Sequence, residues 1–524
     1  MSKSNPLHDP VLLPHLMIAG LNRYHDRPCL HLGDKTATYS EVRARTSQYA
    51  QALASKGLGV GSTVAVLSAN RPEVLYNMAA ASITGCRSTP LHPLGSAADH
   101  AYVLTDAGIE TLVFDGAVFD GRAAEMAERV PTLKHLLAFG SSTVGEDYAA
   151  LADGFEPQPL TPPDVAPEDV CALIYTGGTT GHPKGVMGTY RSAACMTMIQ
   201  MAEWEWPDEI RFLVATPLSH AAGAVFVPTI LNGGALYVLD SFSPDVFFDA
   251  VERHRITTTM LVPVMLYVLL DNPRATEADL SSLKTVFYGA SAISPTRLEE
   301  ALEKWGPIFF QFYGQSEAPM TLTVLRKGEH DPSVPGRLAS CGRPVPWVHV
   351  ALLDDDDRQV AEGEAGEICV RCPMVMTGYW QMPEQTAEVF SGGWLHTGDI
   401  GRFDEDGYLT IVDRTKDMIV TGGFNVFPRE LEDVLATHPA VAQAAVIGVP
   451  DDRWGEAVKA VIVLRPNAVA TDEELIALVK NAKGSVQAPK SVDFVDQIPC
   501  SALGKPDKKA LRAKYWGDRD RGVA

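Results

Sequence analysis

Helix-like stretches alternate with short β-branched runs through the first 320 residues or so of the sequence. In "TYSEVRARTSQYAQALASKGLGVGSTVAVLSAN", a helical apolar pattern ends at Gly57 and Gly59 and leads into the strand-like run "STVAVL". The next helix-like stretch, "RPEVLYNMAAASITGC", is again followed by a short apolar run. Strands that alternate with helices form a mostly parallel sheet with helices on its faces. The alternation therefore predicts an α/β fold for this part of the chain.

The pattern changes twice after this part. Residues 335–412 carry the short runs "HVALLD", "GEICVRCP" and "GYLTIVD" between Gly and Asp, which is typical of a small antiparallel or barrel-like unit. The last hundred residues or so predict a small α+β domain, with helices at "PRELEDVLATH", "TDEELIALVKNAK" and "PDKKALRAKYW" and strands at "AQAAVIGV" and "AVKAVIVL". We place the boundary near Lys416, which gives an N-terminal domain of residues 1–415 and a C-terminal domain of residues 416–524.

The composition excludes some classes of partner. Acidic residues outnumber basic ones by 65 to 44 among the 524 residues, which argues against nucleic acid as the main partner. The most apolar window, "TTTMLVPVMLYVLL", is shorter than a membrane span and contains Pro263, so we interpret it as a buried strand followed by a helix. We expect no transmembrane segment. Peripheral membrane contact and a homodimer both stay open.

The cysteine pattern and the N-terminal sequence both favour a cytoplasmic location. The eight cysteines are scattered without a regular framework, which favours a reducing cytoplasm. Cys369 and Cys372 form one CxxC without a second pair, so we expect no metal or redox role for them. The N-terminus does not have the pattern of a secretion signal.

A glycine-rich segment, "YTGGTTGHPKGVMGTY" at residues 175–190, follows the apolar run "VCALIY". A strand that leads into a Gly/Thr loop presents backbone N–H groups and hydroxyls, which suit phosphates. The spacing differs from the P-loop pattern, because Lys184 stands three residues after Gly181, and it is not GxGxxG either. By itself the segment is also compatible with a structural hairpin.

Further motifs follow in order and resolve this ambiguity. They are "YGASAIS" (288–294), "QFYGQSE" (311–317), "GEICVRCPMVMTGYW" (366–380), "GWLHTGDIG" (393–401), "VDRTKDMIVTGGFNVFP" (412–428) and "ALGKPDKKALR" (502–512). With them the chain resembles the adenylate-forming superfamily of acyl-CoA synthetases, luciferases and adenylation domains over about residues 20–515. Its "TGGFNVFP" segment looks most like bacterial fatty-acid–CoA ligases. The resemblance implies two α/β subdomains and a β-barrel in the large N-terminal domain, with a smaller mobile C-terminal domain.

The resemblance assigns a loop to the β- and γ-phosphates of ATP, in which Gly177 stands where relatives often have Ser. The loop residues are Thr176, Gly177, Gly178, Thr179, Thr180, Gly181 and Lys184. A cationic amine such as that of Lys184 stabilises charge on departing pyrophosphate. Glu317, together with Thr180, is expected to hold Mg²⁺.

The remaining nucleotide contacts are also carried over from the family. Tyr313 is expected to stack on adenine, Ser316 to contact the α-phosphate, and Asp399 with Arg414 to grip the ribose hydroxyls. The other positions expected to line the nucleotide are Gly289, Ala290, Ser291, Gln311 and Phe312.

The C-terminal domain contributes the catalytic lysine. Lys505 matches the lysine that bridges the attacking carboxylate and the α-phosphate, whereas Lys508 and Lys509 are expected to be solvated charges on the last helix. Lys416 matches the hinge. Gly422 and Gly423 match the glycines beside which the pantetheine arm of coenzyme A passes.

The acyl pocket is expected to be mostly apolar or small, which favours fatty acids. Phe312 replaces a Gly of many relatives, and Gly314 replaces the Trp of acetate- and propionate-activating members. Hydroxycinnamate-like, benzoate-like, branched and ring-bearing acids stay open. The pocket positions are His220, Gly223, Val225, Val262, Ser291, Phe312, Gly314 and Ala318.

The implied reaction is an ATP-dependent carboxylate–CoA ligation. ATP and the acid form an acyl-adenylate and pyrophosphate, and the thiol of coenzyme A then displaces AMP. Transfer to a carrier protein is an alternative, as is a non-catalytic nucleotide sensor. Amino-acid activation is disfavoured, because Ala221 stands about where amino-acid-activating relatives place an Asp for the ammonium group.

Overall fold

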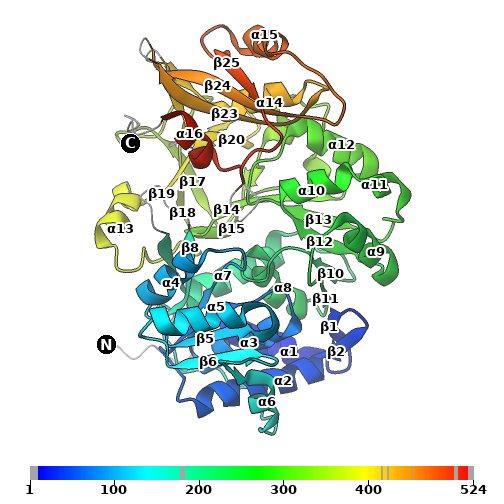
Figure 1. Ribbon diagram of the computed structural model, residues 1–524, viewed down its shortest axis with the longest axis vertical. Coiled ribbons are helices and arrows are strands. Elements are labelled where there is room, and N and C mark those ends of the chain that lie inside the picture. The colour runs from blue at the N-terminus through cyan, green and yellow to red at the C-terminus, as the bar shows by residue number, and fades with distance from the viewer. Residues whose placement is uncertain are drawn as a thin grey trace.

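The computed structural model describes residues 10–176, 183–414, 417–421, 424–451, 454–500 and 506–516. Two large sheets with covering helices form most of the N-terminal domain. The C-terminal elements α14–α16 and β23–β25 lie at the end of the molecule opposite to β5 and β6 (Figure 1). The α/β class and the division into a large and a small domain are thus as predicted from the sequence.

The first large sheet has seven strands in the order β7-β6-β5-β3-β4-β8-β9. Strands β3 to β8 run parallel, and β9 returns antiparallel to β8 at one edge. The strands are β3 (Thr63–Leu67), β4 (Arg87–Pro90), β5 (Thr111–Asp115), β6 (His135–Phe139), β7 (Glu146–Asp147), β8 (Val170–Thr176) and β9 (Lys184–Thr189). The helices of this part of the chain are α1 (Leu13–Arg23), α2 (Tyr39–Ser55), α3 (Pro72–Thr84), α4 (Ala97–Asp106), α5 (Gly116–Arg129) and α6 (Tyr148–Asp153).

The second large sheet has nine strands in the order β16-β15-β14-β13-β12-β10-β11-β1-β2. Its centre is parallel, and the hairpin β14–β15 is antiparallel. The strands are β1 (Pro28–Leu32), β2 (Lys35–Thr38), β10 (Arg211–Val214), β11 (Ala235–Val238), β12 (Thr258–Leu261), β13 (Thr285–Tyr288), β14 (Phe309–Gln315), β15 (Ala318–Leu325) and β16 (Arg343–Pro344). The helices between them are α7 (Tyr190–Glu203), α8 (Phe226–Leu231), α9 (Pro244–His254), α10 (Pro263–Leu270), α11 (Arg274–Glu277) and α12 (Pro295–Trp305).

Two smaller sheets complete the fold. The first is antiparallel and four-stranded, with α13 (Pro383–Val389) beside β17 (His349–Leu353), β18 (Gly366–Arg371), β19 (Leu395–Phe403) and β20 (Leu409–Arg414). The C-terminal sheet contains β21 (Ile419–Thr421), β22 (Phe424–Val426), β23 (Val441–Asp451), β24 (Gly455–Leu464) and β25 (Ser491–Phe494). The helices of this domain are α14 (Pro428–Ala436), α15 (Asp472–Lys483) and α16 (Lys508–Trp516).

Local sequence explains several of these boundaries. Thr38 caps α2 by accepting from the N–H of Glu41, whose carboxylate accepts from the Thr38 N–H in return. The apolar window around Pro263 forms the buried strand β12 and then α10, with Pro263 at the first turn of the helix, as predicted. Within the part of the chain that the structure describes, no helix has the length and apolar character needed to cross a membrane.

One expectation about the last helix is wrong. Lys508 is not a solvated charge, because its side chain is 14% exposed and its Nζ lies 2.8 Å from Glu432 Oε1. Helix α16 packs on β23, so its first residue is held between this strand and α14. Lys509, its neighbour, is exposed as expected.

Candidate active site

The glycine-rich segment connects the two strands of the β8–β9 hairpin. Thr176 and Lys184 are paired across its base. Residues 177–182 lie outside the described residues, and with them Gly177, Gly178, Thr179, Thr180 and Gly181. The Lys184 ammonium lies 4.8 Å from the centre of the Tyr379 ring.

Tyr379 connects Lys184 with Glu317. Its hydroxyl donates to Glu317 Oε1 at 2.9 Å, and the backbone N–H of Met376 donates to the Glu317 carbonyl at 2.8 Å. Burial, with the adjacent Glu317 charge, raises the pKa of Tyr379, so the hydroxyl keeps its proton. Tyr379, on the segment after β18, thus contacts both Lys184, predicted to bind phosphate, and Glu317, predicted to bind Mg²⁺. Tyr379 stands in the motif "GEICVRCPMVMTGYW", but the sequence alone predicted no role for it.

The predicted ribose clamp is assembled from two sheets. Asp399 on β19 pairs with Arg414 on β20, and Arg414 Nε lies 3.1 Å from Asp399 Oδ1. The hydroxyl of Tyr313, from β14 of the nine-stranded sheet, donates to Asp399 Oδ2 at 2.7 Å. Asp399 is 4% exposed, and its charge raises the pKa of Arg414. The Asp399 carboxylate therefore contacts a permanent cation on one oxygen and a hydroxyl donor on the other.

Among the positions predicted to line the nucleotide, Gln311 has a side-chain oxygen that accepts no hydrogen bond from the described groups. Gln311 and Tyr313 alternate with Phe312 along β14. The Gln311 Oε1 atom is buried, and no described group hydrogen-bonds to it. A buried acceptor without a donor costs free energy, so this atom fits a ligand N–H such as the exocyclic amine of adenine.

The backbone around these positions is tightly packed. A Cβ at Gly289 would lie 2.5 Å from the Phe312 carbonyl oxygen, so only glycine fits there. Ala290 has a φ of 66°, which alanine adopts rarely. Phe312 is 4% exposed and stacks on Trp204, with ring centres 4.9 Å apart.

The predicted acyl position His220 lies against a second histidine, His92, which comes from the other large sheet. His220 follows β10 and His92 follows β4, and their rings meet edge to face with centres 4.7 Å apart. His92 Nδ1 accepts from the Leu94 N–H, while its Nε2 is buried with no partner among the described groups. Burial lowers the pKa of His92, with a smaller contribution from His100, so the ring is neutral. Sequence reasoning missed His92, which belongs to none of the quoted motifs.

The other predicted acyl positions are small or apolar. Val225 and Ala318 are buried, and Val262 and Ser291 are partly buried. A Cβ at Gly223 would lie 2.5 Å from the Leu218 carbonyl oxygen.

Gly314 occupies a special place in the β14–β15 hairpin. The register shifts between Tyr313 and Gln315, and a Cβ at Gly314 would lie 2.6 Å from the Met320 nitrogen. A tryptophan at this position would have to displace β15. A Gly314→Trp variant would therefore change the course of β15 as well as the depth of the acyl pocket, so its effect on substrate choice would not measure pocket depth alone.

Several predicted positions lie outside the described residues: Lys505, Lys416, Gly422 and Gly423. Ser316 is described and partly buried, next to Glu317.

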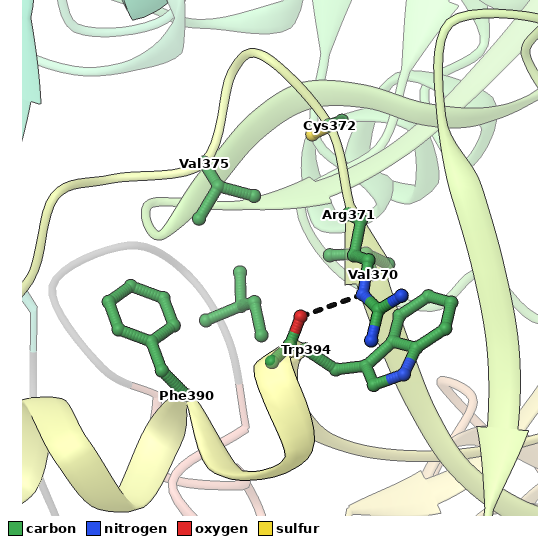
Figure 2. Close-up of a pocket in the computed structure, with 8 residues that line it drawn as sticks. Val370, Arg371, Cys372, Val375, Phe390 and Trp394 are labelled. Carbon is green, nitrogen blue, oxygen red and sulfur yellow. Dashed lines mark hydrogen bonds between the residues drawn. The ribbon is translucent and has the colours of Figure 1, made fainter.

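A pocket of about 300 Å³ lies elsewhere, between β18 and the start of β19. The Arg371 guanidinium lies over the Trp394 ring at 3.8 Å, and its Nε donates to the Gly393 carbonyl at 2.7 Å (Figure 2). The lining residues are Val370, Arg371, Cys372, Val375, Phe390, Gly393, Trp394 and Leu395. None of these is a predicted site residue, so this pocket is separate from the candidate active site.

Comparisons with known proteins show the family to which the chain belongs. Residues 19–380 match the AMP-binding enzyme family, and residues 430–505 match the AMP-binding enzyme C-terminal domain. A medium/long-chain-fatty-acid–CoA ligase of Mycobacterium tuberculosis is 54% identical, over 99% of this chain and 92% of that protein. A feruloyl-CoA synthase of an Amycolatopsis species is 36% identical, over 92% of this chain and 95% of that protein.

Solved structures give the same result. An amide bond synthetase from Marinactinospora thermotolerans has a TM-score of 0.88 and 34% identity, over 95% of this chain and 99% of that one. The chain belongs to the AMP-binding enzyme family, and within this adenylate-forming superfamily it is an acid–thiol ligase of the acyl-CoA synthetase type.

Proposed function

We propose that this ATP-dependent carboxylic acid–CoA ligase acts on fatty acids of medium to long chain. The observation that carries the proposal is the 54% identity, over nearly all of the chain, to a ligase named for such acids. The apolar or small character of the acyl positions supports it, because each methylene buried against apolar walls gains about 0.8 kcal/mol.

The first half-reaction is assigned to the N-terminal site together with Lys505. A carboxylate oxygen of the acid bonds to the α-phosphorus of ATP, and the bond to pyrophosphate breaks. Asp399 accepts from the ribose hydroxyls, Gln311 accepts from the adenine amine, and the Tyr313 ring, held through its hydroxyl, stacks on the base. Lys184 stabilises the charge that develops on pyrophosphate.

Magnesium is part of this proposal. Glu317 is an oxygen ligand of the kind that Mg²⁺ prefers, and the hydroxyl of Tyr379 donates to its Oε1. A bound Mg²⁺ would neutralise charge on the phosphates.

In the second half-reaction the thiol of coenzyme A attacks the acyl carbonyl. The bond between acyl carbon and phosphate oxygen breaks, AMP leaves, and the thiol proton is lost to solvent. Gly422 and Gly423 are assigned to the path of the pantetheine arm. A catalytic enzyme is favoured over a nucleotide sensor by the conjunction of Lys184, Glu317 and Asp399 in one site.

A carrier protein is the second candidate acceptor. A fatty acid–[acyl-carrier-protein] ligase of Streptomyces coeruleorubidus is 33% identical, over 99% of this chain and 99% of that protein.

One screen tests substrate and acceptor together. Pyrophosphate release is measured with acetate, octanoate, palmitate and ferulate, with and without coenzyme A, and the products are identified by mass spectrometry. We expect octanoate or palmitate to be preferred and to give the acyl-CoA. A preference for ferulate or acetate contradicts the proposed substrate class. If the acyl-adenylate forms but is not consumed when coenzyme A is present, coenzyme A is not the acceptor.

A further inference from the structure

A carboxylate outside the predicted site holds the loop that carries Asp399. Glu367 lies on β18, next to β19, with its side chain 26% exposed. Its Oε1 accepts from the Gly398 N–H at 2.8 Å, and its Oε2 lies 2.8 Å from His396 Nδ1. Both oxygens of one side chain thus contact residues that directly precede Asp399.

These contacts are needed because β19 bulges at this point. Glu367 pairs with Ile400, and Cys369 pairs with His396, so residues 397–399 of β19 lie opposite Ile368 alone. A bulge removes backbone groups from the ladder of hydrogen bonds between strands, and these groups then need other partners. Gly398 adopts a φ of 69°, which suits glycine at such a point.

Side chains satisfy the backbone of the bulge. The Thr397 hydroxyl donates to the Ile368 carbonyl at 2.7 Å and accepts from the Asp399 N–H at 3.1 Å. Glu367 supplies a partner for the N–H of Gly398. On the β18 side, the backbone that leads to Asp399 is therefore held by side-chain hydrogen bonds, whereas β20 pairs with Asp399 on the other side.

His396 also contacts the segment that follows β17 and the segment that precedes β19. Its Nδ1 faces Glu367, and because a carboxylate only accepts, this nitrogen carries the hydrogen. Its Nε2 lies 3.3 Å from the Ser391 carbonyl oxygen and 3.4 Å from Asp357 Oδ1. Oxygen acceptors thus lie at both ring nitrogens, and each nitrogen donates to them only when it carries a hydrogen.

We propose that Glu367 and His396 are positioning residues for nucleotide binding, which fix the bulge 397–399 and aim the Asp399 carboxylate at the ribose. The proposal rests on the ribose role given to Asp399 under the proposed function. Tyr313 and Arg414 contact the two oxygens of the carboxylate itself. Glu367 and His396 hold the backbone from which it projects.

A metal site is the competing interpretation of the same cluster. Ligand atoms of Glu367, Cys369 and His396 lie within 4.8 Å of one another. However, both Glu367 oxygens already face N–H donors, and the Cys369 sulfur lies 3.4 Å from His396 Nδ1 within the same set of contacts. Hydrogen bonding alone accounts for the cluster.

The test measures ATP and AMP binding by calorimetry and the KM values for ATP and for the acid. Glu367→Gln should raise the KM for ATP and the Kd for AMP about tenfold, with the KM for the acid and the melting temperature near those of the wild type. Glu364→Gln is the matched control, because Glu364 is exposed on the turn before β18 and should change nothing. For His396, Asn keeps a donor near the Nδ1 position and should retain more AMP affinity than Phe.

The outcomes separate this inference from the function on which it rests. If Asp399→Asn leaves AMP binding unchanged, the ribose assignment itself fails. If Asp399→Asn weakens binding while the Glu367 and His396 variants bind normally, the positioning role is overturned. The positioning role is also overturned if the Glu367 and His396 variants have a lower melting temperature than the wild type and raised KM values for both ATP and the acid. Stoichiometric zinc in the purified protein that is lost in Cys369→Ser would overturn it as well.

Discussion

Single residues of the active site were identified in two different ways. Tyr313, Asp399 and Arg414 stand in recognisable motifs, so the sequence predicted them, and the structure brings the three together. Tyr379 acts through a partner 62 positions away in the chain, and only the folded arrangement shows that its hydroxyl meets Glu317. A sequence motif indicates that a residue has a role, but the hydrogen bond that defines the role depends on the fold.

We predict that Tyr379→Phe slows acyl-adenylate formation. The variant keeps the ring that faces Lys184 and removes the hydrogen bond to Glu317. A hydrogen bond to a charged group contributes about 1.5–3 kcal/mol, so a loss felt mainly in the transition state corresponds to roughly a tenfold to hundredfold lower rate. Pyrophosphate exchange at saturating substrate measures this rate.

The chain offers a matched control for this change. Tyr408 also donates its hydroxyl to a glutamate, Glu329 Oε1, at 2.9 Å, but away from the predicted site. Tyr408→Phe should leave the exchange rate unchanged. Equal rates for the two variants would remove Tyr379 from the catalytic arrangement.

At the scale of elements, helices and strands were predictable where local signals are strong. The helices α14 and α15 appear where they were expected, and α15 begins at a Thr471–Glu474 capping box. The error at Lys508 has a physical reason. Helix α16 is short and rich in lysine, and the sequence does not tell which of its charges meets a carboxylate of another element. The bulges at Gly314 and at residues 397–399 were equally hidden, because they depend on pairing with a distant strand.

We predict that Lys508→Met destabilises the C-terminal domain, while Lys509→Met does not. Lys508 and Glu432 are each 14% exposed in their side chains, and removal of one partner leaves the other buried without its counter-charge. The expected loss is about 2–4 kcal/mol for Lys508→Met and within about 0.5 kcal/mol for the exposed Lys509. Urea denaturation followed by hydrogen–deuterium exchange of the peptides from α14 and α16 reports on this domain. Equal midpoints for the two variants would mean that the ion pair contributes nothing.

At the scale of the whole molecule, the two domains meet at a buried carboxylate. Asp413 lies on β20, close to the predicted boundary near Lys416, and is 6% exposed. Its oxygens accept from the N–H groups of Arg414, at 2.7 Å, and of Arg429 in α14, at 3.1 Å. Helix α14 also contacts α12 of the N-terminal domain. The Asp413 carboxylate thus lies where β20 meets α14 of the C-terminal domain.

The last prediction concerns the pH dependence of this contact. Burial raises the pKa of Asp413 to about 6, against the opposing effect of Lys508. The folded protein then binds the proton more tightly than the unfolded chain, whose aspartate has a pKa near 3.8. The resulting stabilisation is fully present below about pH 4 and is lost as the pH rises through about 6, a change of about 3 kcal/mol. Asp413→Asn cannot titrate, so the difference in free energy of unfolding between the wild type and this variant should shift by that amount from pH 4 to pH 7, in favour of the variant. Asp356→Asn, at a side chain that is 70% exposed, should show no such shift. A difference between wild type and Asp413→Asn that stays constant over this range would mean that the carboxylate at the domain junction is ionised throughout, and that its two backbone donors and Lys508 outweigh the cost of burial.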